Sequence, residues 1–253
     1  TGVVRDTKSK RYSVKFNIHN KLFSWLELTA DANLSRTENS GSASFGQHQS
    51  NPIWVGLNYP PTMEMMDANG NYNKDPYNNI QQNPWGLVHA NQSDRNRTMA
   101  TGHVDLKFNI CDGLTFTTTN GIDFNDYKWY SLASKTVNGT TNMGNNNAQV
   151  MGLQSTNNLT YQHSWGDHNL TATGVWEATS RETRSMGIEG KDLAQEFVGY
   201  WNVKNAATRD ASNGYSKWTM LSGVARVMYN YADRYMLTGT LRADGSSRFT
   251  NKK

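Results

Sequence analysis

Apolar and polar residues alternate with a period of two along much of the chain, and the spacing typical of a helix is rare. The first such run places Tyr12, Val14, Phe16 and Ile18 on one face and Ser13, Lys15, Asn17 and His19 on the other. The pattern predicts eight strands in four hairpins, over residues 12–19, 26–34, 98–110, 114–128, 149–163, 170–181, 217–229 and 235–242. The chain is therefore expected to be all-β.

The connections between these strands alternate between short and long. The short ones are expected at Asn20-Lys21, Cys111–Gly113, Trp165–Asn169 and Asn230–Arg234. The long ones are expected at Ser35–Arg97, Trp129–Ala148 and Glu182–Ser216, and they are rich in Asn, Gly, Ser and Thr. A soluble sandwich has no reason to gather its short turns at one end, whereas a transmembrane β-barrel has short periplasmic turns and long extracellular loops.

Strand length and mid-strand charge agree with a barrel. Several runs are longer than the roughly five or six residues of a typical soluble strand, and about 9–11 tilted residues are needed to cross a bilayer. Charged residues occupy the middle of the predicted strands, at Glu27, Asp31, Asp105, Lys107, Arg226 and Arg242. Neither lipid nor a dry core accepts such charges, but a hydrated lumen does. The sequence predicts an antiparallel transmembrane β-barrel.

Aromatic residues gather near the ends of the predicted strands. Beside the short turns lie Phe23, Trp25, Phe108, Tyr161, Trp165, Tyr229, Tyr231 and Tyr235, and near the opposite ends lie Tyr127, Trp129 and Tyr130. Two such groups are expected at the two membrane–water interfaces, where amphipathic rings settle. Ordinary aromatic pairing across the strands of a soluble sheet is the alternative explanation.

The composition is compatible with this fold. Hydrophobic residues make up 36% of the 253 residues, below the roughly 45–50% of an average soluble protein, as expected if only every second residue meets lipid. Aromatic residues reach 11%, which argues against disorder. The single cysteine, Cys111, excludes an internal disulfide, and the net charge of +4 is too small to indicate a nucleic-acid partner.

Residue patterns for catalysis or metal binding are poor. Ser131–Lys135 lacks the Ser-x-x-Lys spacing, Gly41–Gly46 lacks the Gly-x-Ser-x-Gly spacing, and the six histidines are dispersed. Asp67–Asp75 superficially suggests a calcium loop, but the positions that need Gly and Glu hold other residues, so a β-turn at Asn69-Gly70 is the better interpretation. We expect no enzyme activity, no metal and no cofactor.

The long loop 35–97 is rich in aromatic residues and contains all five prolines of the chain, which stiffen it. The candidate substrate-binding residues are Trp54, Tyr59, Tyr72, Tyr77 and Trp85, whose rings can stack on sugars or on peptide side chains. The alternative is that these rings form a small core of the loop itself.

The last third of the chain carries a recognisable motif. Its residues are Arg226, Tyr229, Tyr231, Arg234, Tyr235, Arg242, Asp244, Gly245, Arg248 and Phe249. This motif resembles the SusC/RagA-type TonB-dependent outer-membrane transporters, as do His168–Leu170 and Asn51–Trp54 followed by Asp67–Tyr72. We expect a structural role for the motif, with an ion pair between Asp244 and Arg248 and a positive φ at Gly245.

The resemblance implies a larger assembly. Members of the family have a signal peptide, a plug domain and about 22 barrel strands, so residues 1–253 are expected to be an interior part of the barrel wall, with 35–97 as an extracellular loop. It further implies a location in the outer membrane of a Gram-negative cell, in contact with its lipid. The implied partners are a SusD-like surface lipoprotein and the TonB complex, which acts through the plug. The implied cargo is an oligosaccharide or a peptide.

Two other hypotheses remain open. A complete eight-stranded barrel serving as an adhesin or anchor would require the first strand to pair with the last. A soluble all-β glycan-binding or glycosidase module would bury its apolar residues between two sheets. The decisive observation is whether Leu28, Leu106 and Leu159 lie in a sealed interior, with Glu27 and Lys107 outside.

Overall fold

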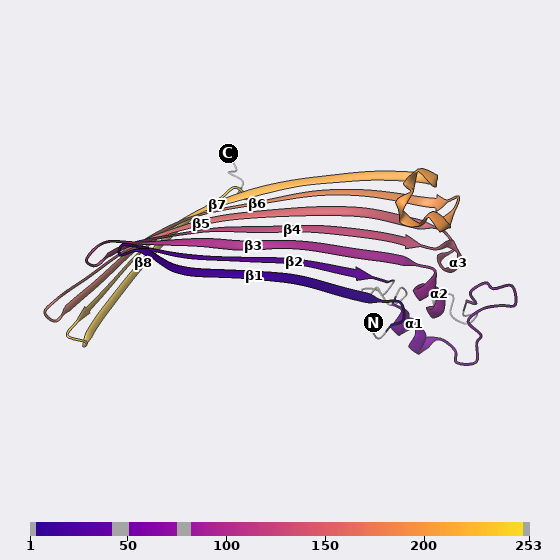
Figure 1. The fold of residues 1–253 in the computed structure, drawn as a ribbon, viewed down its shortest axis with the longest axis horizontal. Helices are drawn as coiled ribbons and strands as arrows, with labels where there is room; N and C mark the ends of the chain where they lie inside the picture. Colours follow the sequence, from indigo (N-terminus) through magenta and orange to yellow (C-terminus); the bar gives the residue numbers. More distant parts are fainter. Residues whose placement is uncertain (1–3, 42–50, 75–81, 250–253) are drawn as a thin grey trace.

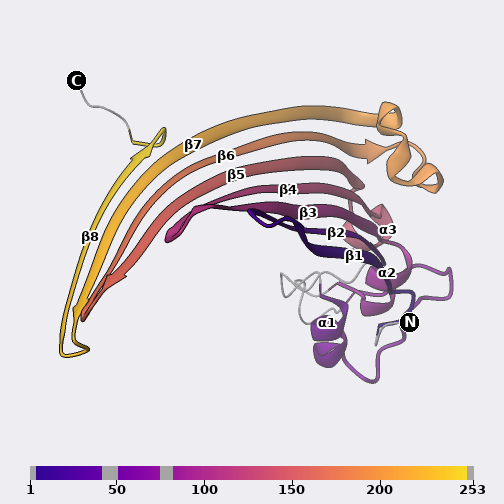
Figure 2. The same ribbon diagram turned by 60° about the vertical axis from the view of Figure 1, so that its left-hand side comes forward.

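The computed structural model describes residues 4–41, 51–74 and 82–249. Within them, eight strands form one antiparallel sheet in which each strand pairs with its neighbours in the sequence. The sheet is a single long, curved layer (Figures 1 and 2). Its strands are β1 (Lys8–Phe23), β2 (Leu26–Ser40), β3 (Gln92–Cys111), β4 (Leu114–Ala133), β5 (Asn142–Trp165), β6 (His168–Leu193), β7 (Ala206–Tyr231) and β8 (Tyr235–Ser246).

Short and long connections lie at opposite ends of the sheet, as the sequence predicts. Turns of two or three residues join β1 to β2, β3 to β4, β5 to β6 and β7 to β8. The helices lie at the other end, in the long connections (Figure 1). They are α1 (Pro52–Asn58), α2 (Pro84–His89), α3 (Lys135–Asn138), η2 (Glu196–Trp201) and η3 (Val203–Asn205). No helix among the described residues is long and apolar enough to cross a membrane.

The strands are longer than predicted, mostly at the loop end. The expected loops 129–148 and 182–216 shorten to 134–141 and 194–205, because the flanking strands continue through them. The expected turn at Asn20-Lys21 is wrong: β1 continues to Phe23, with Asn20 opposite Leu28 and Lys21 opposite Glu27. These residues have the composition of a turn, but cross-strand partners hold them in the ladder.

The two faces of the sheet differ in chemistry. Leu28 lies opposite Leu106 in the register, and the adjacent pair is Glu27 opposite Lys107. Because successive residues of a strand point to opposite faces, the two pairs lie on different sides of the sheet. We call the side with Leu28 and Leu106 the apolar face and the side with Glu27 and Lys107 the polar face. Leu159 on the apolar face is 39% exposed, and Lys107 forms an ion pair with Glu27 (3.7 Å). The described strands thus lack a sealed interior. A soluble sandwich would bury these apolar side chains between two sheets, whereas a membrane sheet turns them toward lipid.

A polar cluster interrupts the apolar face in β4 and β5. Asn120 lies opposite Ser155, and Thr118 lies opposite Asn157. Asn120 donates a hydrogen bond to Thr118 Oγ1 (3.1 Å), and Asn157 donates one to Ser155 Oγ (3.3 Å). Hydrogen bonding between neighbours lowers the cost of placing these groups in an apolar setting.

The sheet is open. β1 and β8 form its two edges, and within the described residues they do not pair with each other. An eight-stranded closed barrel would require that pairing, so the hypothesis of a small complete barrel does not fit the structure. Open edges in lipid would leave a row of unpaired backbone groups. The sheet therefore has the form of a barrel segment.

Aromatic rings form a stacked series that begins at the turn end with the predicted residues Phe23, Trp25 and Phe108 and continues into the apolar band. Phe23 stacks on Trp25 with ring centroids 5.5 Å apart, and Trp25 stacks on Phe108 at 6.1 Å. Phe108 continues the series to Phe116 at 5.9 Å, and Phe116 to Trp176 at 5.8 Å. This arrangement suits the aromatic girdle of a membrane interface.

Three ion pairs mark the other limit of the apolar face. They join Arg36 to Glu38 (2.7 Å), Asp126 to Lys128 (3.6 Å) and Glu182 to Arg184 (2.6 Å). The register connects Arg36 through Thr98 to Asp126, and Asp126 through Gln149 to Arg184, so the three pairs lie in one row across β2 to β6. We call them the ion-pair row.

The ion-pair row divides the strands into two regions. We call the apolar face between the turns and this row the apolar band, and the sheet beyond the row the upper wall. In β6, for example, Leu170–Ala178 precedes the row and Met186–Leu193 follows it. Charges at this position fit the end of the hydrocarbon layer, because a charged side chain costs little near the interface and much at the bilayer centre.

Candidate functional site

The polar face carries charged residues between the turns and the ion-pair row, most of them on β2 and β3. His103 lies between Asp31 and Asp105, with Nδ1 in contact with Asp31 Oδ1 and Nε2 3.5 Å from Asp105 Oδ2. A hollow of about 390 Å³ on this face is lined by Asp31, His103, Asp123, Gln154, Arg181 and Trp218, among others. Such a surface can contact water and polar cargo.

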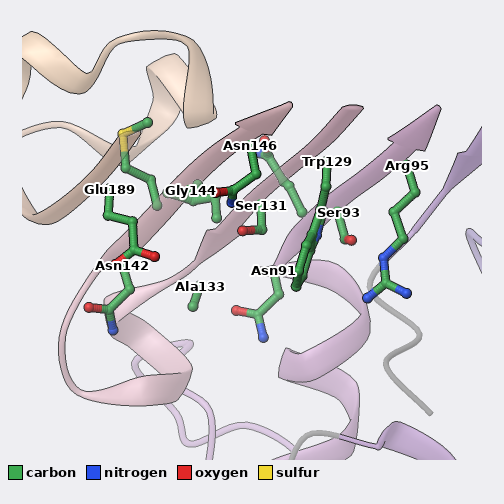
Figure 3. A pocket seen from close by; sticks show the side chains of 13 residues that line it. Asn91, Ser93, Arg95, Trp129, Ser131, Ala133, Asn142, Gly144, Asn146 and Glu189 are labelled. Carbon is green, nitrogen blue, oxygen red and sulfur yellow. The ribbon is translucent and has the colours of Figure 1, made fainter. Parts of the chain in front are cut away.

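A second hollow, of about 450 Å³, lies on the upper wall. Four strands, β3 to β6, form it, and its labelled side chains are shown in Figure 3. Most of its lining residues share the parity of the polar face: Asn91, Ser93, Arg95, Trp129, Ser131, Ala133, Asn142, Gly144, Asn146 and Glu189. We call this hollow the trough.

Arginine and aromatic side chains form a ladder at one side of the trough. The guanidinium of Arg95 lies 4.8 Å from the ring centroid of Trp129, and that of Arg97 lies 4.9 Å from the ring centroid of Tyr127. Both are cation–π contacts. The expected second aromatic girdle at Tyr127, Trp129 and Tyr130 is therefore wrong for Tyr127 and Trp129, because their position in the alternation places them on the side of the polar face.

The two arginines of the ladder differ in their partners. Arg97 donates to Asn125 Oδ1 from Nε (3.1 Å) and from Nη2 (2.7 Å), and Asn125 donates to Asp123 Oδ1 (2.6 Å). No acidic side chain among the described residues pairs with Arg95. The guanidinium of Arg95 thus lies over the Trp129 ring, and within the described residues no hydrogen bond engages its N–H groups.

Small residues form the floor of the trough. A Cβ at Gly187 would lie 2.6 Å from Asn146 Oδ1 and 2.9 Å from Ser212 Oγ, and one at Gly144 would lie 3.3 Å from Ser131 Oγ. Side chains at these two positions would push the polar groups of the floor apart. Gly144, which lines the trough, therefore leaves room beside Ser131, and Gly187 leaves room beside the lining residue Asn146.

Glu189 carries the negative charge of the trough. It lies on β6, three strands from Arg95 on β3, and Figure 3 shows the two side chains at opposite ends of the hollow. Within the described part of the chain, Glu189 has no ion-pair partner. The trough is thus dipolar, with a guanidinium at one end, a carboxylate at the other, and amide and hydroxyl groups between them.

A clasp made by η2 fixes the outer side of the upper wall. The carboxylate of Glu196 accepts hydrogen bonds from Ser134 Oγ (2.6 Å), from the backbone N–H of Lys135 (2.7 Å) and from Thr141 Oγ1. Desolvation by burial opposes ionisation of Glu196, but these hydrogen bonds outweigh it and lower its pKa. We call Glu196 and these three partners the clasp.

Tyr200 extends the contact between η2 and the sheet. Its hydroxyl donates to Asp94 Oδ2, and its ring stacks on Tyr130 at 5.5 Å. Desolvation, followed by the hydrogen bond to Asp94, raises the pKa of Tyr200. The buried residues Leu132, Met143, Leu193, Tyr200 and Ala206 form a core cluster here. This packing holds rigid the four strands that form the trough.

The candidate aromatic residues of loop 35–97 lie in different environments. Tyr59 is 6% exposed, and its hydroxyl donates to the backbone carbonyl of Asn73 (3.1 Å). Trp54 and Tyr72 pack against the buried cluster of Val55, Leu87 and Val137, which joins α1, α2 and α3.

Trp85 is the most accessible of these candidates that the structure describes. Its side chain is 38% exposed and stacks on His89, with ring centroids 4.0 Å apart. Tyr77 lies outside the described residues. The structure therefore packs Trp54 and Tyr72 against the small core of the loop and buries Tyr59, and none of the three lines the trough.

The expected turn at Asn69-Gly70 is present. Gly70 has a φ of 80°, and Asp67 accepts hydrogen bonds from the backbone N–H groups of Asn69 (2.9 Å) and Asn71 (2.8 Å). The hydrogen bond from the Asn71 side chain is the largest of the contributions that lower the pKa of Asp67. No group of three or more possible metal ligands occurs in the described part of the chain.

Two details expected for the motif in the last third are wrong. Asp244 pairs with Arg242 (2.8 Å), whereas the guanidinium of Arg248 lies over the ring of Trp218 at 4.8 Å. Gly245 lies within β8 opposite Leu221 and has no positive φ, because the strand continues to Ser246. Residues two apart on a strand share a face, which brings Arg242 to Asp244.

The tyrosines of the motif lie at the turn end. Tyr229 forms a 2.5 Å hydrogen bond with His168 Nδ1, and the rings of Tyr231 and Tyr235 stack at 6.4 Å. The backbone N–H of Arg234 donates to the carbonyl of Tyr231 (3.0 Å) and closes the turn. Phe249 is exposed. These contacts are local to the hairpin, which suits the structural role expected for the motif.

Comparison with known proteins gives consistent relatives. No family model matches the chain. It is 23% identical over 258 residues to TonB-dependent receptor P3 of Formosa agariphila, covering 98% of this chain and 26% of the relative. TonB-dependent receptor P39 of the same organism is also 23% identical, covering 93% and 24%. The chain thus spans about a quarter of the curated relatives it matches.

Solved structures show the same fold. The structure of the RagAB peptide transporter aligns with a TM-score of 0.79 at 18% identity, covering 97% of this chain and 29% of that one. BauA, the ferric preacinetobactin receptor of Acinetobacter baumannii, aligns with a TM-score of 0.53 at 12% identity, covering 99% and 36%. The open two-faced sheet is therefore a segment of an outer-membrane β-barrel.

The relatives indicate which kind of outer-membrane protein this chain is similar to. Both curated relatives are TonB-dependent receptors, and the solved structure with a TM-score of 0.79 is RagAB. Over nearly its whole length the chain is similar to part of these TonB-dependent receptors and shares the fold of a part of RagAB, in keeping with the resemblance of the motif in its last third.

Proposed function

We propose that residues 1–253 form part of the wall of a TonB-dependent importer that carries bulky nutrients across the outer membrane. The observation that carries the proposal is the two-faced sheet. Its apolar side suits lipid, and its polar side carries paired charges such as Glu27 and Lys107 among neutral polar residues. The cargo passes this polar side without being chemically changed.

The finer parts of the proposal come from the relatives. The cargo is an oligosaccharide or a peptide; the protein described as RagAB is a peptide transporter. A SusD-like surface lipoprotein covers the extracellular loops, among them 35–97. The TonB complex supplies the energy through a plug domain. In the described loop residues, Trp85 offers the most accessible ring for cargo, and Tyr77 and the rings of Trp54, Tyr59 and Tyr72 remain candidates.

Uptake by cells tests the proposal. Cells that express the whole receptor are given a labelled peptide mixture or labelled oligosaccharides, and uptake is measured with and without TonB. Ser131→Trp fills the trough on the polar-face side and is expected to reduce uptake severalfold. Met186→Trp lies on the opposite side of the upper wall, is exposed, and serves as the matched control. Uptake that is independent of TonB, or equally unaffected by both substitutions, would contradict the proposal.

A further inference from the structure

We infer that the trough binds a short peptide by its two charged ends, with the terminal carboxylate at Arg95 and the terminal ammonium at Glu189. This inference rests on the proposed function, because it assigns a cargo class to the polar side of the upper wall. It adds a specific subsite formed by β3 to β6, outside the aromatic loop in which the sequence places the candidate contacts.

The first argument is charge that lacks a partner. In the ion-pair row, by contrast, Arg36 pairs with Glu38 and Arg184 with Glu182. In the described residues, Arg95 and Glu189 have no oppositely charged partner, and both line the trough. A ligand with a carboxylate and an ammonium group would give Arg95 and Glu189 an oppositely charged partner each.

The second argument is that Arg95 is preorganised. Its guanidinium lies on the ring of Trp129 at 4.8 Å, which restricts the side chain while leaving the edge of the guanidinium free. Planar guanidinium groups bind carboxylates with two parallel hydrogen bonds. Arg97 has the same ring contact, but its N–H groups are engaged by Asn125. Arg95 is therefore the anion-binding member of the ladder.

The third argument is length. β3 and β6 are three strand spacings apart, or about 14 Å between their axes. An extended peptide spans about 3.3–3.6 Å per residue, so roughly three or four residues fit between the two charged groups. Between the ends, Asn142 and Asn146 supply amide groups and Ser93 and Ser131 supply hydroxyl groups. These groups can donate to and accept from a peptide backbone.

The fourth argument is discrimination. A neutral oligosaccharide can use the amides, the hydroxyls and the free side of the Trp129 ring, but it leaves the guanidinium and the carboxylate without a partner. A peptide with free ends uses all of these groups. The dipolar arrangement therefore favours peptides over neutral sugars, and it favours free ends over blocked ones.

The test compares the ends separately. The purified whole receptor is titrated with tetra-alanine, with N-acetyl-tetra-alanine and with tetra-alanine amide, and binding is measured calorimetrically. Each blocked end is expected to weaken binding about three- to tenfold, the range for a charge-assisted contact that is partly exposed to water. Arg95→Gln should remove the effect of the amide only, and Glu189→Gln the effect of the acetyl group only.

Matched controls lie on the other side of the same wall. Glu182→Gln and Arg184→Gln change the same residue types on β6 outside the trough and are expected to leave all three affinities unchanged. Equal affinity of the wild type for the free and both blocked peptides would overturn the inference. If cells still take up peptides through TonB in that case, the proposed importer stands and only the end-recognition subsite fails.

Discussion

The apolar band and the upper wall are two halves of the same strands, and they differ on one side only. In β6, Leu170, Ala172 and Trp176 occupy the apolar face within the band, whereas Glu182 and Arg184 occupy the same side at the ion-pair row. The other side stays polar in both halves, from Glu177 to Glu189. The backbone hydrogen bonds between the strands therefore continue from the apolar band into the upper wall, although the environment of the outer side changes.

This difference shows what holds each half. In the band, the lipid selects the outer side chains and the sheet needs no core. In the upper wall neither side meets lipid, and the sheet is stabilised by local packing instead, with η2 and the buried cluster around Leu132 and Met143 on one side. The upper wall can therefore extend the polar lining of the barrel beyond the membrane as a rigid surface.

The largest expected effect tests the difference between the apolar band and the ion-pair row within one strand. Val104 and Thr98 lie on the same side of β3, Val104 in the middle of the apolar band and Thr98 at the ion-pair row. Val104→Arg is expected to lower the free energy of unfolding in lipid vesicles by about 2–4 kcal/mol, and Thr98→Arg by about 0–1 kcal/mol. Equal effects of the two substitutions in a denaturant titration would show that Val104 does not face lipid.

A smaller effect is expected from the clasp, which belongs to the upper wall alone. Glu196→Gln keeps the shape of the side chain but removes the charge that accepts three hydrogen bonds. It is expected to cost about 1 kcal/mol, because hydrogen bonds to a charged group are stronger than neutral ones but solvent screens part of this gain. Hydrogen exchange should rise at residues 194–205 and stay unchanged in the apolar band. Faster exchange throughout the sheet would contradict a local role.

The same contrast explains which parts of the fold the sequence predicts. In the apolar band the two sides of a strand meet different solvents, so alternation such as Glu27, Leu28, Thr29, Ala30 is visible in the sequence. In the upper wall neither side meets lipid, and Asn142–Asn147 gives no alternating signal even though β5 passes through it. The existence of eight strands and their hairpins could therefore be predicted, whereas the loop-end boundaries could not.

The trough could not be predicted from the sequence for the same reason. Trp129 and Glu189 fall in segments that the sequence assigns to loops, and their proximity to Arg95 depends on pairing between β3, β4, β5 and β6. The loop aromatics Trp54 and Tyr59 were conspicuous in the sequence because of their size and their flanking prolines. A usable signal for the trough was the alternate placement of Ser93, Arg95 and Arg97 just before a predicted strand.

The pH dependence of the clasp sharpens the distinction between the halves. Because the pKa of Glu196 is lowered in the folded chain, its ionisation stabilises the fold above the pKa of the unfolded state, and this contribution is lost as the pH falls through the lowered folded value. Exchange protection at residues 194–205 should therefore decrease in strongly acidic solution. Glu196→Gln should abolish this pH dependence. If it persists in that variant, other carboxylates, such as Asp94 beside Tyr200, control the contact.

The smallest expected effect concerns the ion-pair row, which separates the two halves. Arg184 and Glu182 are an exposed pair of residues on one strand, and exposed pairs contribute only about 0–1 kcal/mol because water competes for both charges. Arg184→Gln should therefore change stability by no more than about 0.5 kcal/mol, measured by denaturant titration in vesicles. Moving the charge is different: Leu153→Arg on β5 places a cation two rows into the band and should cost more than the loss of Arg184. A large loss from Arg184→Gln would mean that the row binds a partner, such as an anionic lipid headgroup, that the pair alone does not explain.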